Sequence, residues 1–360
     1  TLAATTVIGR LLWPHINDAI VSFVSLLIVL SSSLWFGRRT GVLAVVLAAL
    51  APAVGATGGP LHVETVTKVG VMVAFFVYGL TLSFAALTGG AMNWRLHLAV
   101  QMGTFLIFPI AGFGLVKVAA PWMSADLRFG FIYLCALPST ISSSVALTAV
   151  ARGNVPGAVF NATLSSLLGV VLTPLWLYVL AGVAGAQGDL GSSIFDIARM
   201  LVLPMALGQL CRPVLGAWAA RHRAKLQLTD RCLILFLIYS SFCDSFAHKI
   251  WAGHSLTLLV GITVGSGVLF AVLVFAMVGI ARLLGFDHGD RVALIFCGSK
   301  KSLAQGVIMA KVLLAAHPAA GLVLLPLMIY HALQLVVGGI LAPRWASAVE
   351  GKANALASRG

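Results

Sequence analysis

Runs of about twenty apolar residues recur along the whole chain, and they constrain the fold more than any other feature. Apolar residues make up 60% of the 360 residues, charged residues only 9%, and the mean hydropathy is +1.04. An ordinary soluble domain carries roughly 25% charged residues. A membrane barrel would show short alternating segments instead of long runs. The sequence therefore predicts an all-α integral membrane protein.

Hydropathy windows of about 19 residues predict ten transmembrane helices. They are expected at 41–57, 66–88, 94–119, 127–152, 155–182, 193–215, 228–249, 255–284, 289–316 and 319–342. An eleventh apolar run at 16–36 precedes them. It is either an extra N-terminal helix that spans the membrane or a segment that lies at the surface, and both interpretations stay open.

The chain is strongly basic, with 23 Lys and Arg against 10 Asp and Glu and a formal net charge of +13. In a membrane protein such an excess usually reports loop orientation. Fourteen basic residues fall on the side of the 211–231 loop and six on the other side. The positive-inside rule then places both ends of the ten-helix unit in the cytoplasm, which suits a bacterial inner membrane or a plasma membrane. The sequence contains no basic block with interleaved aromatic residues, so no nucleic-acid partner is expected.

Two predicted helices are interrupted by small and polar residues. The interruptions read "LPSTISSS" (137–144) and "CGSKKS" (297–302). Each falls about 100 residues after its half of the ten-helix unit begins, as two five-helix repeats require. An odd number of helices per repeat inserts the second repeat upside down. Inverted repeats with interrupted helices are typical of secondary transporters, because unwound backbone must line protein or water.

The expected organisation therefore has four parts. They are an N-terminal extension at 1–36, a first five-helix repeat at 37–182, a second, inverted five-helix repeat at 183–345, and a cytoplasmic tail at 346–360. The two breaks are expected near 138–144 and 298–302 and should cross within contact distance. The five cysteines are scattered without metal-binding spacing, so no metal site and no cofactor are expected.

Two stretches carry a resemblance to a known family. "ALPSTISSSVALTAVARGNVPGAVFNATLSSLLGVVLTPLW" (136–176) and "FCGSKKSLAQGVIMAKVLL" (296–314) resemble the bile acid:sodium symporter superfamily. Within it they are most similar to the sodium/bile acid cotransporter 7-like branch and its bacterial relatives. The resemblance implies a core domain in which the two broken helices cross. It also implies a panel domain, which the helices near 41–88 and 193–249 should form.

The same resemblance shows a departure at the sodium sites. Sodium-coupled members carry Glu-x-Gly-x-Gln-Asn in the ninth helix. Aligned on Gly298, this chain has Phe296 at the glutamate, Lys300 at the glutamine and Lys301 at the asparagine. Hard cations prefer several oxygen ligands, so the resemblance implies altered sodium sites, and bound sodium is not favoured.

A buried ammonium at the crossing can supply the positive charge that sodium supplies in the relatives. The free-energy cost of burying such a charge at mid-membrane is high. Each lysine should therefore contact carbonyls, hydroxyls or a carboxylate. Lys301 is the favoured inward residue; the alternative is that one lysine snorkels to an interface and only the other is functional. The expected substrate and ion ligands are Gln101, Thr104, Ser142, Ser143, Ser144, Asn161, Ser299, Lys300, Lys301 and Ser302.

Acidic residues near the ninth helix have a simpler expected role. Asp287 and Asp290 border its inner end, where helix N-terminal capping is expected of both. His331, in the tenth helix, is expected to be an ordinary hydrogen-bonded histidine.

These features favour a secondary-active transporter of a small organic anion that works by alternating access in a lipid bilayer. A membrane-embedded enzyme is one alternative, with Ser143 or Ser144 as nucleophile and Lys301 as base. No oxyanion motif is evident, and an inverted repeat has no obvious purpose in catalysis, so an enzyme is not expected. A non-transporting regulator of ion homeostasis is the third interpretation. The sequence fixes neither the substrate nor the oligomeric state.

Overall fold

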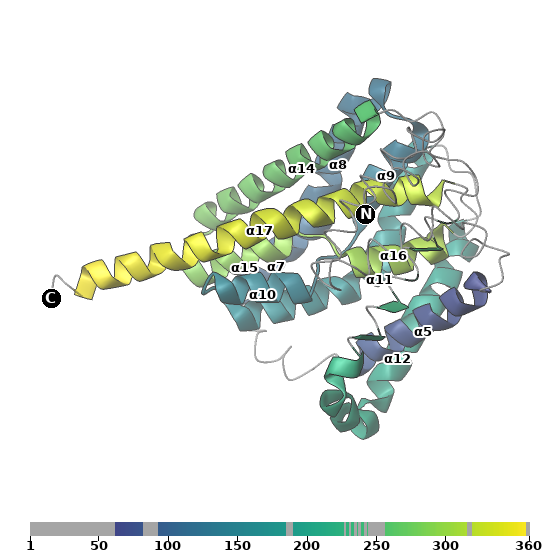
Figure 1. The fold of residues 1–360 in the computed structure, drawn as a ribbon, viewed down its shortest axis with the longest axis horizontal. Coiled ribbons are helices and arrows are strands. Elements are labelled where there is room, and N and C mark those ends of the chain that lie inside the picture. Colours follow the sequence, from purple (N-terminus) through teal and green to yellow (C-terminus); the bar gives the residue numbers. More distant parts are fainter. Residues whose placement is uncertain are drawn as a thin grey trace, which may run out of the picture.

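The computed structural model describes residues 62–81, 93–184, 190–226, 228–229, 232–233, 236, 239–240, 243, 256–314 and 319–357. The predicted runs at 16–36 and 41–57 lie outside these residues, as does most of the run at 228–249. Helices account for the regular secondary structure of the described part of the chain (Figure 1).

The elements follow one another along the chain. They are α5 (Val63–Thr81), α7 (Trp94–Met102), the π-helical turn η2 (Gly103–Ile107), α8 (Phe108–Ala119), the 3-10 turn η3 (Ala120–Trp122), α9 (Ala125–Ala136), α10 (Ser142–Val150), α11 (Val155–Ala184), α12 (Leu190–Arg221), α14 (Leu256–Leu283), α15 (His288–Gly298), α16 (Leu303–Leu313) and α17 (Ala320–Ala357).

Five described stretches are long and apolar enough to cross a membrane. They are Trp94–Trp122, Val155–Leu180, Leu258–Leu283, His288–Leu313 and Ala320–Ser347. Each coincides with one of the expected runs, which confirms the membrane class of the fold. The last helix extends beyond its expected end, because residues 346–357 of the expected tail continue α17 (Figure 1).

The first break separates α9 from α10 at residues 137–141. It begins because Pro138 has no N–H for the Leu134 carbonyl and holds Leu137 in an extended conformation with ψ of 155°. The expected break at 138–144 is therefore wrong at its C-terminal edge. Residues 142–144 form the first turn of α10, where serines are common and helix formation can begin.

The second break separates α15 from α16 at residues 299–302, one residue shorter than expected. The Ser302 hydroxyl accepts a hydrogen bond from the Gln305 N–H at 3.3 Å and so caps α16. The two breaks cross. The Ser302 N–H donates to the Pro138 carbonyl at 2.9 Å, and the Ser139 hydroxyl donates to the Cys297 carbonyl at 2.6 Å. This contact confirms the predicted crossing.

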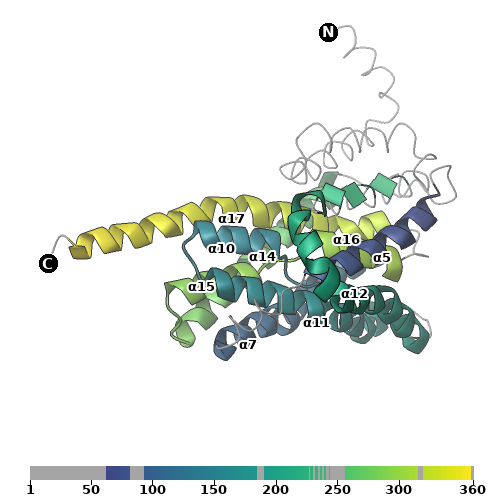
Figure 2. The ribbon, with the colours of Figure 1, turned by 90° about the horizontal axis from the view of Figure 1, so that it is seen from below.

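The remaining helices enclose the crossing. α9 packs against α8, α11 and α17, while α15 packs against α7, α10, α11 and α14. α5 and α12 lie side by side at one edge of the molecule (Figures 1 and 2). α5 and α12 belong to the stretches near 41–88 and 193–249 that were expected to pack together, and their contact confirms the part of this expectation that lies within the described residues.

Two glycines let α5 and α12 approach closely. A Cβ at Gly79 would collide with the Met205 carbonyl, and a Cβ at Gly208 would collide with the Phe76 carbonyl. The expected separation of this pair from the other helices is only partial. Val71, Ala74 and Phe75 of α5 belong to the same buried apolar cluster as residues of α9, α16 and α17.

Candidate functional site

The Lys301 ammonium lies at the centre of the crossing. Its side chain is 0% exposed. Its Nζ donates to the Thr104 carbonyl at 2.9 Å, the Cys135 carbonyl at 2.8 Å and the Leu137 carbonyl at 2.5 Å. An ammonium has three N–H donors, so these three oxygens satisfy all of them. We call Lys301 Nζ and these three carbonyls the carbonyl cage.

The first oxygen of the carbonyl cage is available because of the π-helical turn. In η2 the Phe108 N–H bonds to the Gly103 carbonyl, five residues back, rather than to Thr104. The next residue, Pro109, has no N–H to offer. The Thr104 carbonyl therefore has no helical donor and can accept from Lys301. Pro109 also deprives the Phe105 carbonyl of its helical donor, and the Trp176 Nε1–H takes its place at 2.7 Å.

The other two oxygens belong to the end of α9. The last carbonyls of a helix have no intrahelical donors and carry its negative partial charge. The Ser139 N–H, which could return to Cys135, donates instead to the Ser165 hydroxyl at 2.9 Å. Because Pro138 ends the helix, the Cys135 and Leu137 carbonyls turn to Lys301. The carbonyl cage is thus made from two interrupted helices.

Aromatic rings complete the surroundings of Lys301. Its Nζ lies 4.1 Å from the Phe108 ring centroid and 5.8 Å from the Phe105 ring centroid. A ring face attracts a cation within about 6 Å, and more strongly when water is excluded. Carbonyl oxygens and ring faces together therefore compensate this buried charge.

α17 fixes the unwound backbone between α15 and α16. The Gln334 side chain accepts from the Lys301 N–H at 2.9 Å and donates to the Lys301 carbonyl at 2.9 Å. The Tyr330 hydroxyl donates to the Ser299 carbonyl at 2.6 Å. His331 is hydrogen-bonded as expected, with Nδ1 2.7 Å from Gln334 Nε2. Sequence reasoning missed the roles of Tyr330 and Gln334, which lie in the predicted tenth helix beside His331.

Lys300 has different surroundings. Its side chain is 1% exposed, so neither lysine snorkels to an exposed position and that alternative is wrong. Its Nζ donates to the Ser143 carbonyl at 3.3 Å and lies 4.8 Å from the Phe296 ring centroid. Within the described part of the chain, Ser143 supplies the one hydrogen-bond acceptor of this ammonium. α17 packs closely here, since a Cβ at Gly338 would lie 2.6 Å from Leu147 Cδ1 and 3.6 Å from Lys300 Nζ.

Three of the serines that were expected as ligands form hydrogen bonds at the crossing; that of Ser144 joins the two broken helices, whereas those of Ser143 and Ser299 are local. The Ser144 hydroxyl donates to the Phe296 carbonyl at 2.9 Å, the Ser143 hydroxyl to Thr140 Oγ1 at 3.3 Å, and the Ser299 hydroxyl to the Ile295 carbonyl at 2.6 Å. Carbonyls rather than hydroxyls therefore contact the lysines. Ser142 lies in the first turn of α10.

Gln101, Thr104 and Asn161 were also expected as ligands, and the first and last of them form a polar pair. Gln101 Nε2 lies 3.2 Å from the Asn161 carbonyl and 3.3 Å from Asn161 Oδ1, so these two residues pair with each other. The Thr104 hydroxyl donates to the Val100 carbonyl at 2.9 Å. Of the three, Thr104 contacts a lysine, and it does so through its backbone carbonyl.

Ala158 and Ala162 lie at positions where the resemblance places a serine and a threonine of the sodium-coupled relatives. Both are buried, as is Phe296 at the position of the glutamate. None of these three side chains offers an oxygen ligand. Among the described residues, no group of three His, Cys, Asp or Glu side chains could hold a metal ion.

A separate polar cluster ties three helices at the other end of α15. Asp290 accepts from Asn93 Nδ2 at 2.5 Å and from Asn154 Nδ2 at 2.7 Å, which joins α7, α11 and α15. Asp287 accepts from the Asp290 N–H at 2.7 Å and caps α15, as expected. A capping role for Asp290 is wrong, because two amide groups from other helices occupy its carboxylate.

Comparisons with known proteins agree on one family. The model of the SBF-like CPA transporter family matches residues 39–347. An uncharacterized protein of Pseudomonas aeruginosa is 42% identical over 313 residues, which cover 87% of this chain and 93% of that protein. The candidate symporter YfeH of Escherichia coli is 40% identical over 286 residues, covering 78% and 84%. Sodium/bile acid cotransporter 7 of Danio rerio is 35% identical over 319 residues, covering 88% and 94%.

Proposed function

Because the chain belongs to the SBF-like CPA transporter family, we propose that it is a secondary-active transporter of a small organic anion, working by alternating access. In this proposal ten helices form two inverted five-helix repeats in a bacterial inner membrane, with both ends in the cytoplasm. Two broken helices that cross are the feature by which such transporters place a binding site at mid-membrane. The crossing of residues 137–141 and 299–302 supports this reading.

We further propose that Lys301 takes the place of a coupling sodium ion. The observation that carries this proposal is the carbonyl cage, in which three carbonyl oxygens at 2.5 to 2.9 Å surround one cation. Backbone carbonyls from interrupted helices are also the ligands with which transporters coordinate sodium. A tethered ammonium supplies a comparable charge at all times, so no ion has to be loaded. Sodium is therefore not the favoured partner of this chain.

Lys300 is then the cation that meets the substrate. One hydrogen bond of 3.3 Å and one ring face compensate its charge only partly. A buried cation without a full set of partners is unfavourable, and the negative group of a substrate would relieve this. These contacts favour an anion over a neutral or cationic solute.

The hydrogen bonds of the serines disfavour the enzyme alternative. A Ser-Lys pair needs the lysine amine within reach of the serine hydroxyl. The Lys301 ammonium donates to three carbonyls, and the Ser144 hydroxyl donates to the Phe296 carbonyl. No observation favours a non-transporting regulator.

Counterflow in proteoliposomes tests the proposed function. Vesicles loaded with an unlabelled organic anion should accumulate the labelled anion transiently, and replacing sodium by potassium should leave the initial rate unchanged. Lys300→Met should abolish accumulation while the protein still reconstitutes. The matched control is Lys311→Met, which removes the same charge from the last turn of α16, outside the crossing. Equal loss of accumulation in the two variants would refute the role of Lys300.

A further inference from the structure

One face of α12 lines an open pocket away from the crossing. Its volume is about 500 Å³, and the described residues that line it are Gln209, Arg212, Pro213, Gly216 and Ala217. The spacing i, i+3, i+4, i+7, i+8 places all five on one side of the helix. We call this surface the Arg212 groove. Pockets of roughly 300 to 1,000 Å³ are the usual size for small organic ligands.

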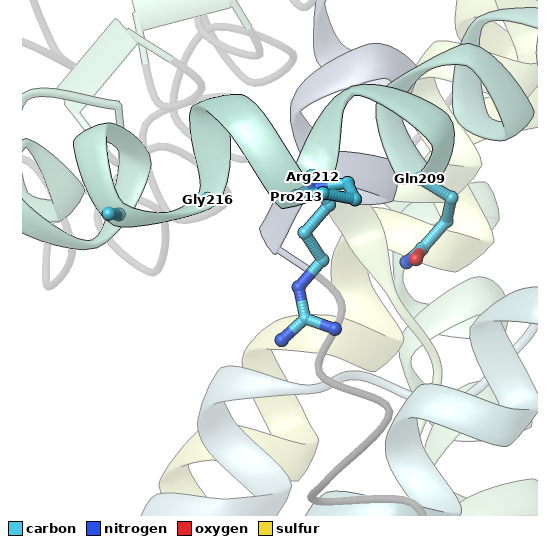
Figure 3. A pocket seen from close by; sticks show the side chains of 5 residues that line it. Gln209, Arg212, Pro213 and Gly216 are labelled. Carbon is cyan, nitrogen blue, oxygen red and sulfur yellow. The ribbon is translucent and has the colours of Figure 1, made fainter.

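The polar residues of the Arg212 groove point to the same side. Figure 3 shows the Arg212 guanidinium extending away from α12 and the Gln209 side chain directed the same way. Gln209 is held in place, since its Nε2 donates to the Gly79 carbonyl near the end of α5 at 2.6 Å. Gly216 makes room for Arg212, because a Cβ there would lie 3.2 Å from Arg212 Cγ. Because residue 216 has no side chain, the Arg212 side chain can extend into the groove.

The charge around the Arg212 groove is positive. Residues 201–231 contain five basic residues and one acidic residue; they are Arg212, Arg221, Arg223, Lys225, Arg231 and Asp230. Within the described residues Arg212 forms no ion pair. A guanidinium binds carboxylate, sulfonate and phosphate oxygens in pairs, and such charge-assisted bonds are the strong ones. Pro213, Gly216 and Ala217 supply an apolar surface beside this charge.

We propose that the Arg212 groove binds an amphipathic anion, with its oxyanion head on Arg212 and its apolar body along Pro213, Gly216 and Ala217. Arg212 lies nine residues before the end of α12, about 13 Å along the axis. That end is the one expected in the cytoplasm, so the groove can be reached from the cytoplasm or from the inner leaflet. The oxyanion head belongs either to a transported solute or to an anionic lipid. The solute source rests on the proposed function, and the lipid source does not.

Equilibrium binding of decanoate tests the groove in nanodiscs of neutral phosphatidylcholine. The neutral alcohol decanol serves as the matched ligand. Decanoate should bind and raise the melting temperature, whereas decanol should not. Arg212→Gln should weaken decanoate binding by about tenfold or more, as expected for a lost charged hydrogen bond. Gly216→Leu should weaken it as well, because the added side chain occupies the path of Arg212. Arg221→Gln, which removes an equal charge from the last turn of α12, should bind normally.

A second arm identifies the source of the oxyanion. Phosphatidylglycerol in place of phosphatidylcholine should raise the melting temperature of the unaltered protein, and not that of Arg212→Gln, if a lipid occupies the groove. Decanoate binding that persists in phosphatidylglycerol points to a solute. No Arg212-dependent effect in either arm, or equal loss in Arg212→Gln and Arg221→Gln, overturns the proposal. Neither arm requires transport, so failure here leaves the counterflow result unaffected.

Discussion

Lys300 and Lys301 are neighbours in the chain, yet their ammonium groups lie in two different regions. The region around Lys301, between α8 and the end of α9, provides three carbonyl oxygens and two aromatic rings. The region around Lys300, between α10 and α17, provides one carbonyl at 3.3 Å and one ring. The comparison teaches that one buried cation is held by the protein, whereas the other retains capacity for a ligand.

The unwound backbone explains how neighbours can differ so much. Residues 299–302 are not helical, and their two lysines reach different elements: Lys300 bonds to Ser143 of α10, and Lys301 bonds to carbonyls of η2 and of the end of α9. A continuous helix would separate them by about 100° and place both near the same neighbours. The break between α15 and α16 therefore creates two distinct cation environments from one pair of residues.

The largest expected effect is on stability at Lys301. Lys301→Met should lower the free energy of unfolding by about 4 kcal/mol, because three buried carbonyls lose their donor. Lys300→Met should change it by less than about 1 kcal/mol, because the loss of one long hydrogen bond is offset by removal of a buried charge that the protein compensates only partly. Chemical unfolding of the detergent-solubilised protein, followed by circular dichroism, measures both values. Similar losses in the two variants would remove the distinction between the regions.

For ligand binding, unlike stability, the larger effect is expected at Lys300. Lys300→Met should weaken binding of an organic anion by about 2 kcal/mol, near thirtyfold in Kd, because the ligand loses its direct charge partner. Isothermal titration with the anion that gives counterflow provides the value. Lys300→Arg is the conservative control and should recover part of the affinity. An unchanged Kd for Lys300→Met would show that this ammonium does not meet the substrate.

Much of this arrangement could be predicted from sequence, but the carbonyl cage could not. Pro138 and the small residues around Gly298 marked both breaks, and the family resemblance indicated that the breaks cross. Carbonyls, hydroxyls or a carboxylate were expected around each lysine, but the sequence did not indicate which carbonyls would be available. Backbone carbonyls have no residue signature. Their availability depends on the π-helical turn at Gly103–Ile107, for which Pro109 was the visible clue.

Gln334 tests whether α17 keeps the two environments apart. Gln334→Leu removes the amide that bonds to both the N–H and the carbonyl of Lys301. The expected loss is about 2 kcal/mol in the free energy of unfolding, because the two hydrogen bonds to Lys301 and the one to His331 disappear. Anion affinity should fall with it, since the Lys300 side chain loses its fixed backbone. A variant with reduced stability and unaltered affinity would separate Gln334 from the positioning of Lys300.

The smallest effect is expected at Trp176, outside both lysine regions. Trp176→Phe removes the donor to the Phe105 carbonyl, which Pro109 leaves without a helical partner. The free energy of unfolding should fall by about 1 kcal/mol, as for one hydrogen bond, and anion affinity should remain the same. Thermal unfolding beside the Lys301→Met variant gives the comparison. A larger loss than for Lys301→Met would mean that the π-helical turn depends on Trp176 more than on Lys301.

The cation dependence of binding tests most directly whether Lys301 stands in for sodium. Affinity for the transported anion should be measured in sodium, potassium and choline chloride at constant ionic strength. A tethered ammonium in the carbonyl cage is always present, so the three affinities should agree. Affinity that rises strongly with sodium would contradict this, and Lys301 would then be a structural residue beside an ion site located elsewhere.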